Sequence, residues 1–192
     1  MPALTTREKL IQAGHKIFYR EGFLLVGLDR LLNEVGCSKQ TFYNHFESKD
    51  DLICAVIDEH HRWWNKELRD RLQRIAGADA RGQLLGMFDV MDEIMHEPEY
   101  HGCIFINAAV EFPQPHHPAH QTARRAKADG LALLEDLSER AGASDPPALA
   151  QEIDMVIEGA LITQQVAPDC DVCAIARRAA ETLLEKYIPA AV

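Results

Sequence analysis

The stretch LDRLLNEVGCSKQTFYNHF, residues 28–46, decides the fold because it predicts two short helices joined by a tight turn. The apolar residues of the first helix repeat at helical spacing: Leu28, Leu31, Leu32 and Val35. Gly36 stands where a left-handed residue commonly ends a helix, and Ser38 is a typical N-cap for a second helix over 39–46. Two helices joined by three residues that include a glycine are typical of a helix-turn-helix.

The two faces of the second helix differ in chemistry. Phe42 and Phe46 are four residues apart, so they share one face, which we expect to pack inward. The outward and flanking residues are Lys39, Gln40, Thr41, Tyr43, Asn44 and His45. Glutamine and asparagine can pair with adenine, lysine with guanine, and a threonine methyl group can contact thymine. This face therefore favours double-stranded DNA as a partner, and the alternative is two packed helices with a solvated polar surface.

Composition restricts the class of protein. The 192 residues are 47% hydrophobic and 26% charged, which excludes a disordered tail or a collagen-like fibre. Neither a membrane-spanning run nor a signal peptide is recognisable, and the five unevenly spaced cysteines favour reduced thiols, so we expect a cytoplasmic protein that does not bind membranes. The net charge of -10 argues against a general nucleic-acid binder. However, residues 1–50 hold seven Lys/Arg and six Asp/Glu, so the acidity belongs to the rest of the chain.

The whole chain is predicted to be all-α, because helical periodicity recurs along it and strand alternation is almost absent. Capping boxes at Thr5-x-x-Glu8 and Ser48-x-x-Asp51 begin two helices, and Pro189 is expected to stop the last one. The nine predicted helices span about 6–21, 28–35, 39–46, 48–75, 79–95, 102–111, 117–141, 147–166 and 171–187.

Residues 5–52, and above all GCSKQTFYNHFESKDDL at 36–52, resemble the DNA-binding domain of the tetracycline-repressor (TetR) family of bacterial transcriptional regulators. The matching residues are Gly36, Ser38, Thr41, Phe42, Tyr43, His45, Phe46, Ser48, Lys49, Asp50 and Leu52, with Phe18, Gly22 and Phe23 upstream. The resemblance implies a helix-turn-helix DNA-binding domain over 1–48 and an effector-binding and dimerisation domain over 49–192. We predict a homodimeric repressor, rather than an activator, that a small molecule releases from its operator. A twofold dimer presents two recognition helices about one turn of DNA apart, so the operator should be a near-palindrome.

One departure concerns the residues before the first helix of the motif. The family usually carries Thr or Ser there, which cap that helix and touch a phosphate, whereas this chain has Val26 and Gly27. We expect Arg30, one turn further on, to replace the phosphate contact that the absent hydroxyl would make. The predicted DNA-binding residues are then Arg30, Ser38, Lys39, Gln40, Thr41, Tyr43, Asn44, His45 and Lys49, of which Tyr43, His45 and Lys49 suit phosphate.

Two apolar stripes near the C-terminus predict a four-helix interface between two copies of the chain. The predicted interface residues are Leu149, Ile153, Val156, Ile157, Ala160, Leu161, Gln164, Ile175, Ala179 and Leu183. Gly159 would permit close approach. The alternative is that both stripes belong to the core of a single chain.

A small-molecule effector would need a mostly apolar cavity with a few polar groups. The candidates are the aromatic, Met and Asn residues of 60–112: Trp63, Trp64, Phe88, Met91, Met95, Phe105, Asn107 and Phe112. Such residues at helical spacing are more often plain core. The acidic surroundings favour a cationic or neutral effector.

Other chemistry has weaker support, and we predict no cofactor, no metal and no enzymatic activity. Cys170-x-x-Cys173 lacks the second pair that a zinc ribbon requires, and Cys103 has an apolar setting that favours an inert thiol. His116, His117 and His120 lie beside prolines without a neighbouring acid or thiol. A regulator that responds to a metal or to thiol oxidation is the alternative. A helical enzyme is a distant one, because Glu93-Ile94-Met95-His96 has no second copy.

Overall fold

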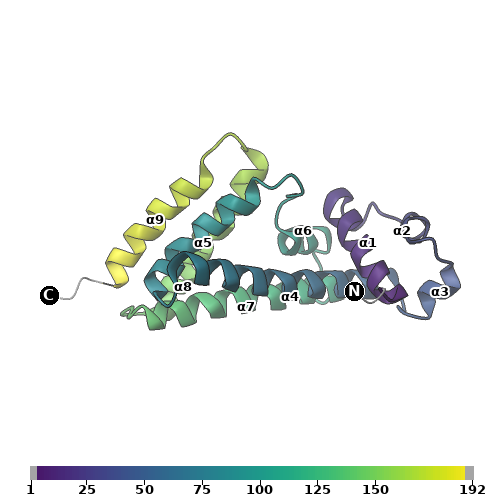
Figure 1. The fold of residues 1–192 in the computed structure, drawn as a ribbon, viewed down its shortest axis with the longest axis horizontal. Coiled ribbons are helices and arrows are strands. Elements are labelled where there is room, and N and C mark those ends of the chain that lie inside the picture. The colour runs from purple at the N-terminus through teal and green to yellow at the C-terminus, as the bar shows by residue number, and fades with distance from the viewer. Residues whose placement is uncertain (1–3, 189–192) are drawn as a thin grey trace. The chain divides into compact units, whose positions relative to one another are not determined.

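The computed structural model describes residues 4–188, which form nine α-helices and no strand (Figure 1). The helices are α1 (Thr6–Glu21), α2 (Leu28–Val35), α3 (Lys39–Tyr43), α4 (Lys49–Ala76), α5 (Ala80–Met95), α6 (Ile104–Glu111), α7 (Pro118–Arg140), α8 (Pro146–Val166) and α9 (Val172–Tyr187). The all-α prediction is confirmed for the described residues. The predicted stop at Pro189 lies outside them.

Local chemistry explains most helix ends. The Thr5 hydroxyl accepts the Glu8 backbone N–H, and the Glu8 carboxylate accepts the Thr5 N–H at 2.7 Å, so the predicted capping box is present. Gly36 ends α2 in the left-handed region at φ 72°, as its position predicts. The Ser48 hydroxyl accepts the Asp51 N–H, but the Asp51 carboxylate accepts from Glu47 rather than from Ser48. That second capping box is therefore only half formed.

The second helix of the motif is shorter than its predicted span of 39–46, because α3 ends at Tyr43. The His45 N–H returns to the Phe42 carbonyl three residues back, which tightens the chain into a turn. The Phe46 N–H still bonds to the Phe42 carbonyl four residues back. Phe46 therefore stays on the inward face although it lies beyond the helix.

The chain divides into two compact units. The first unit runs up to Trp64 and includes Cys103–Ala126, and the second comprises Asn65–Gly102 and the chain from Lys127 onward. Helices α4 and α7 each contribute to both units. The functional division at residue 48 remains a prediction.

The first unit is built around one apolar core. Side chains from α1, α2, α3 and the first half of α4 meet residues of α6 and α7 in this core. Leu10, Leu31, Phe42 and Leu52 are fully buried there. Alanines at 119, 123 and 126 provide the α7 side of this core, and such small side chains allow close packing.

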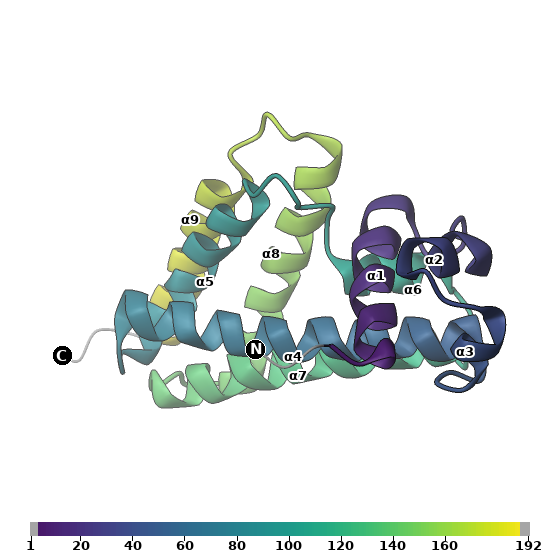
Figure 2. The same ribbon diagram turned by 45° about the vertical axis from the view of Figure 1, so that its right-hand side comes forward.

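In the second unit, α9 packs against α5 and α8 (Figure 2). Its core includes Leu84, Val90, Leu149, Ile153 and Leu184, all fully buried. Arg177 fastens α9 to α5 through the Asp89 carboxylate at 2.6 Å and the Leu85 carbonyl. Among residues 4–188, no helix combines the length and the apolar character that crossing a membrane requires.

Candidate functional site

Helix α3 is held from behind by aromatic side chains. Phe42 is fully buried and Phe46 nearly so, and their ring centroids lie 5.7 Å apart. Both rings belong to the core that contains Leu31 and Leu32 of α2, so α2 and α3 are fastened to each other. The inward orientation predicted from the spacing of the two phenylalanines is confirmed.

The other side of α3 faces solvent. Lys39, Gln40, Tyr43, Asn44 and His45 are exposed, and Thr41 is half-buried. The Tyr43 side chain is 57% exposed although it follows a buried residue. The Ser38 hydroxyl accepts the Thr41 N–H at 3.1 Å and lies 2.9 Å from the Thr41 hydroxyl. Ser38 therefore caps α3, while Gln40 and Asn44 remain at the surface.

Two predicted DNA-binding cations are engaged with carboxylates of their own unit. Lys39 Nζ lies 2.9 Å from Asp29, and this contact raises the pKa of Lys39. Arg30 pairs with Glu34 at 3.0 Å and with Glu21 at 3.5 Å. All five side chains are at least one-third exposed, so these are surface pairs of small free energy. A phosphate could displace such carboxylates.

Lys49 is positioned differently from the other predicted phosphate ligands. Its Nζ donates to the Phe23 backbone oxygen at 2.6 Å and lies 5.8 Å from the centroid of the Phe18 ring. Burial lowers the pKa of Lys49, against the opposite effect of Asp50 and Glu111. The sequence does not predict this internal contact, since Lys49 and Phe23 are 26 residues apart.

The predicted effector residues are divided between the two units. Trp63, Trp64, Phe105, Asn107 and Phe112 belong to the first, and Phe88, Met91 and Met95 to the second. Phe105 and Phe112 lie in the apolar core of the first unit, which fits the plain-core alternative. Phe88 is nearly fully buried, whereas Trp63 is exposed.

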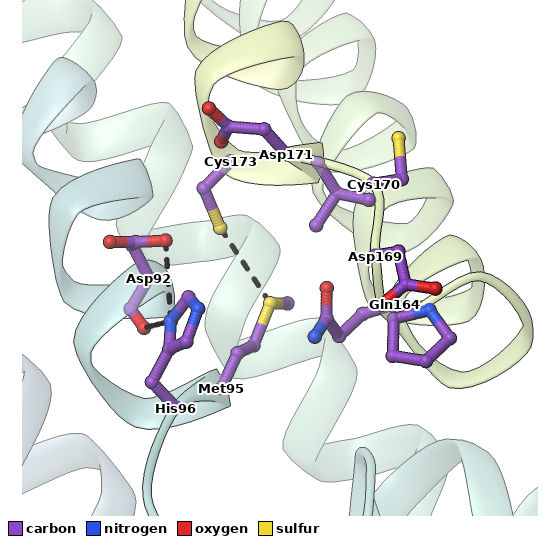
Figure 3. Close-up of a pocket in the computed structure, with 10 residues that line it drawn as sticks. Asp92, Met95, His96, Gln164, Asp169, Cys170, Asp171 and Cys173 are labelled. Atoms are coloured by element: carbon purple, nitrogen blue, oxygen red, sulfur yellow. Dashed lines mark hydrogen bonds and ion pairs between the residues drawn. The ribbon is translucent and has the colours of Figure 1, made fainter.

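A pocket of about 360 Å³ lies in the second unit, where the end of α5 meets the α8–α9 connection (Figure 3). It is lined by Asp92, Met95, His96, Gln164, Pro168, Asp169, Cys170, Asp171, Val172 and Cys173. Met95 is the one predicted effector residue among them. Sequence reasoning missed the rest of this lining, because the residues come from separate segments and carry no common motif.

The pocket brings the Cys-x-x-Cys pair close to other polarisable atoms. Figure 3 shows the Cys173 thiol directed toward the Met95 sulfur, 3.6 Å away, while the Cys170 thiol points elsewhere. Burial, aided by Asp92 and Asp171, raises the pKa of Cys173 to about 11. Nδ1 of His96 donates to the Asp92 backbone oxygen. All five cysteines are free, and no three His, Cys, Asp or Glu residues converge as a metal site within residues 4–188.

The predicted dimer residues differ in how far they are exposed. Leu149, Ile153 and Ala160 are buried within the single chain, so they serve its own core, as the alternative interpretation held. Ile175 and Ala179 are exposed, Gln164 lines the pocket, and the remaining members are half-buried: Val156, Ile157, Leu161 and Leu183.

Sequence reasoning missed the exposed apolar face of α8. Met155 is 75% exposed, Val166 80% and Ile162 44%, and Gly159 is exposed between them. These four residues follow one another at intervals of three and four, so they lie on one side of the helix. The signal was present as a second apolar stripe beside the buried one.

Two protein-family models match the chain, one over the helix-turn-helix and one over the second half. Residues 10–56 match the family described as bacterial regulatory proteins, tetR family, and residues 80–180 match the tetracyclin repressor-like C-terminal domain. An HTH-type transcriptional regulator of Escherichia coli, YjdC, is 30% identical over 81% of each chain. An uncharacterised HTH-type regulator of Lactococcus lactis is 28% identical over 87% of each.

A solved structure agrees with these matches. A TetR-family transcriptional regulator from Streptomyces coelicolor superposes with a TM-score of 0.83 at 29% identity, covering 95% of both chains. The two family matches coincide with the helix-turn-helix and with the helices that carry the pocket and the exposed apolar face of α8. The chain therefore belongs to the TetR family of DNA-binding transcriptional regulators.

Proposed function

We propose that this protein is a cytoplasmic homodimeric repressor that binds a palindromic operator and is released by a small-molecule effector. The observation that carries the proposal is the pair of exposed surfaces: the polar outer side of α3 and the apolar outer side of α8, beside which α9 exposes Ile175 and Ala179. A polar surface free of acids suits base edges and phosphates, and an apolar surface favours burial against another protein.

The DNA-binding role belongs to residues 1–48 in this proposal. Gln40, Asn44 and Thr41 contact base edges, while Tyr43 and His45 contact phosphates. Arg30 and Lys39 exchange their carboxylate partners for phosphates when DNA binds. Two copies related by a twofold axis would present their α3 helices about one helical turn of DNA apart, roughly 34–36 Å, so the operator has inverted half-sites.

Dimerisation and effector binding belong to residues 49–192. The outer face of α8 (Met155, Gly159, Ile162 and Val166) supports a four-helix interface, with Ile175 and Ala179 from α9. Nothing lies within 4 Å of a Cβ built on Gly159, so its surface is open to a partner. Because glycine has no side chain, a helix of the second copy can approach closely there. The effector binds the second unit and favours a state in which the spacing of the two α3 helices no longer fits the operator.

The decisive experiment selects duplexes from a random library with the full-length protein. Enrichment of an inverted repeat supports the proposal, and enrichment of a single half-site or of nothing contradicts it. A thermal-shift screen of small molecules against the same protein then identifies ligands. Each hit is tested for loss of the gel shift on the selected duplex, and hits that never release the duplex would contradict effector-released repression.

A second candidate is a regulator that responds to a soft metal ion or to thiol oxidation. It is favoured by one observation, namely that Cys170, Cys173, Met95 and His96 line the same pocket. The raised pKa of Cys173 opposes it, because the thiolate is the reactive form. Gel shifts with and without Cu(I), Cd²⁺ or hydrogen peroxide, using Cys170→Ser with Cys173→Ser, separate this candidate from the first.

A further inference from the structure

The turn between α1 and α2 has little of its own to fix it. Phe23 and Val26 are buried, but Leu24 and Leu25 are exposed, Leu25 by 87%. Hydroxyls cap α1 and α3, whereas the N-cap of α2 is Gly27, which supplies no side-chain hydrogen bond. The turn is therefore held by the burial of Phe23 and Val26 and by polar groups from elsewhere in the first unit.

The carboxylate of Glu111, the last residue of α6, holds this turn. Its Oε1 accepts the Phe23 backbone N–H at 3.1 Å, and its Oε2 accepts the Leu24 N–H at 2.7 Å. Gly22 adopts φ 87°, and a Cβ built on it would lie 3.4 Å from both carboxylate oxygens. Such a distance is an ordinary van der Waals contact, so the positive φ is what requires a glycine at this position.

A cation completes the arrangement from the opposite side. Lys49 Nζ donates to the Phe23 carbonyl oxygen at 2.6 Å, so charged side chains bind both polar backbone atoms of Phe23. Hydrogen bonds with one ionised partner are shorter and stronger than neutral ones. We call Glu111, Lys49 and the Phe23 peptide the turn clamp.

The connection that follows Glu111 also contacts the helix-turn-helix region. The Phe112 ring lies 6.0 Å from Phe23 and stacks on His117 at 4.3 Å. His117 in turn lies 3.4 Å from the carboxylate of Asp50, in the first turn of α4. The end of α6 is thus seated against the turn and against α4 within one compact unit.

We propose that Glu111 is a positioning residue for DNA binding, which fixes the start of α2 through the turn clamp without contacting DNA. Because α2 and α3 share the core around Leu31, Leu32 and Phe42, the placement of α2 determines that of α3. A shift at the end of α6 would consequently reach the recognition surface through this carboxylate and the neighbouring ring of Phe112. The inference rests on the DNA-contacting role proposed for α3.

The test compares Glu111→Gln with Glu135→Gln, the same chemical change at an exposed glutamate of α7. The glutamine at 111 keeps the size of the side chain, but its amide group can accept only one of the two N–H donors. We expect roughly tenfold weaker binding to the selected duplex with an unchanged salt slope. The unfolding midpoint should fall slightly, because one charge-assisted hydrogen bond is lost, while the protein stays folded under the binding conditions. The control substitution should leave all three quantities at wild-type values.

A second readout needs no DNA. In the free wild-type protein, the Leu24 and Phe23 amide protons should resonate at low field and exchange slowly with solvent. At least one of the two signatures should be lost in Glu111→Gln, whose amide keeps one acceptor oxygen, and both should be kept in Glu135→Gln. Lys49→Met should also weaken DNA binding with an unchanged salt slope, because it removes the other half of the clamp, whereas the loss of a phosphate contact would lower that slope by about 1.

The outcomes separate this inference from the wider proposal. Amide signatures that are absent in the wild type, or unaffected by Glu111→Gln, overturn the clamp itself. Lost signatures with unchanged DNA affinity overturn the positioning role. If the library yields no duplex, the proposed function fails. The positioning role is then tested on sheared genomic DNA. Weaker binding by Glu111→Gln than by the wild type supports the positioning role, and equal affinity overturns it.

Discussion

The outer side of α3 and the outer side of α8 are both exposed, yet they are opposites in chemistry. Helix α3 presents Gln40, Tyr43 and Asn44, whereas α8 presents Met155, Ile162 and Val166. A polar surface loses little by staying in water and gains specificity from matched hydrogen bonds. An apolar surface gains free energy from any burial, so it favours association. The contrast teaches that exposure alone assigns no role until the chemistry of the exposed atoms is considered.

The largest expected effect contrasts two neighbouring residues of α3. Phe42→Ala should lower the free energy of unfolding by about 3–5 kcal/mol, because it leaves a cavity at a fully buried position. Tyr43→Ala should cost about 1 kcal/mol or less, since Tyr43 is exposed and loses mainly its edge contact with Phe42. Urea unfolding measures both, and equal losses would contradict the assignment of the two faces.

The second largest effect is expected from a charge placed on the exposed apolar face of α8. Met155→Glu places a charge where the proposed interface excludes water, which should weaken dimerisation by about 3 kcal/mol, roughly 100-fold in Kd. Ala132→Glu, at an exposed position of α7, is the matched control. Sedimentation across a concentration series reports the dissociation constant. A dimer that persists in Met155→Glu would remove α8 from the interface.

Acid should destabilise the protein through a histidine pair of the first unit. His15 Nε2 lies 2.8 Å from His60 Nδ1 between α1 and α4, and burial lowers the pKa of both, that of His60 to about 3. Between pH 6.5 and 3 the unfolded chain therefore binds more protons than the folded chain, so stability falls as pH falls. The slope reaches at most about 1.4 kcal/mol per pH unit for His60.

The pH effect is checked by urea unfolding at pH 7 and pH 5. His60→Gln should flatten the difference between the two pH values, whereas His96→Gln, at an exposed position of the second unit, should leave it unchanged. The same pH dependence in His60→Gln and the wild type would refute a contribution from the buried pair.

The smallest expected effect concerns one hydroxyl. Tyr43→Phe removes the proposed phosphate contact and should weaken binding by about 1 kcal/mol on every duplex alike. Fluorescence anisotropy on the selected duplex and on a scrambled one measures this. A loss confined to the selected duplex would instead assign Tyr43 to base recognition.

Helix boundaries could be predicted well, because their causes are local. Thr5, Gly36 and Asp145 cap or end helices through neighbours within four residues, and the structure agrees within two residues at most ends. The end of α3 could not be predicted, since nothing in the sequence distinguishes a helical His45 from one in a tight turn. Local chemistry thus suffices for the elements and not always for their last turn.

The candidate site could be predicted only in part, because several of its contacts join residues that are far apart in the sequence. The inward and outward sides of α3 follow from the spacing of Phe42 and Phe46. The contact of Glu111 with Phe23 joins residues 88 apart, and the pocket joins α5 to the α8–α9 connection, so neither leaves a periodic signal. The buried and exposed stripes of α8 are both apolar, and only the packed structure separates Ile153 from Met155.

The central claim, that the outer side of α3 contacts base edges, is tested most directly by repeating the duplex selection with Gln40→Ala. The control is Gln114→Ala, at an exposed position outside the helix-turn-helix. Gln40→Ala should relax the preference at particular base pairs of both half-sites, while Gln114→Ala should return the wild-type sequence. An unchanged preference in Gln40→Ala, and likewise in Thr41→Ala and Asn44→Ala, would contradict the central claim.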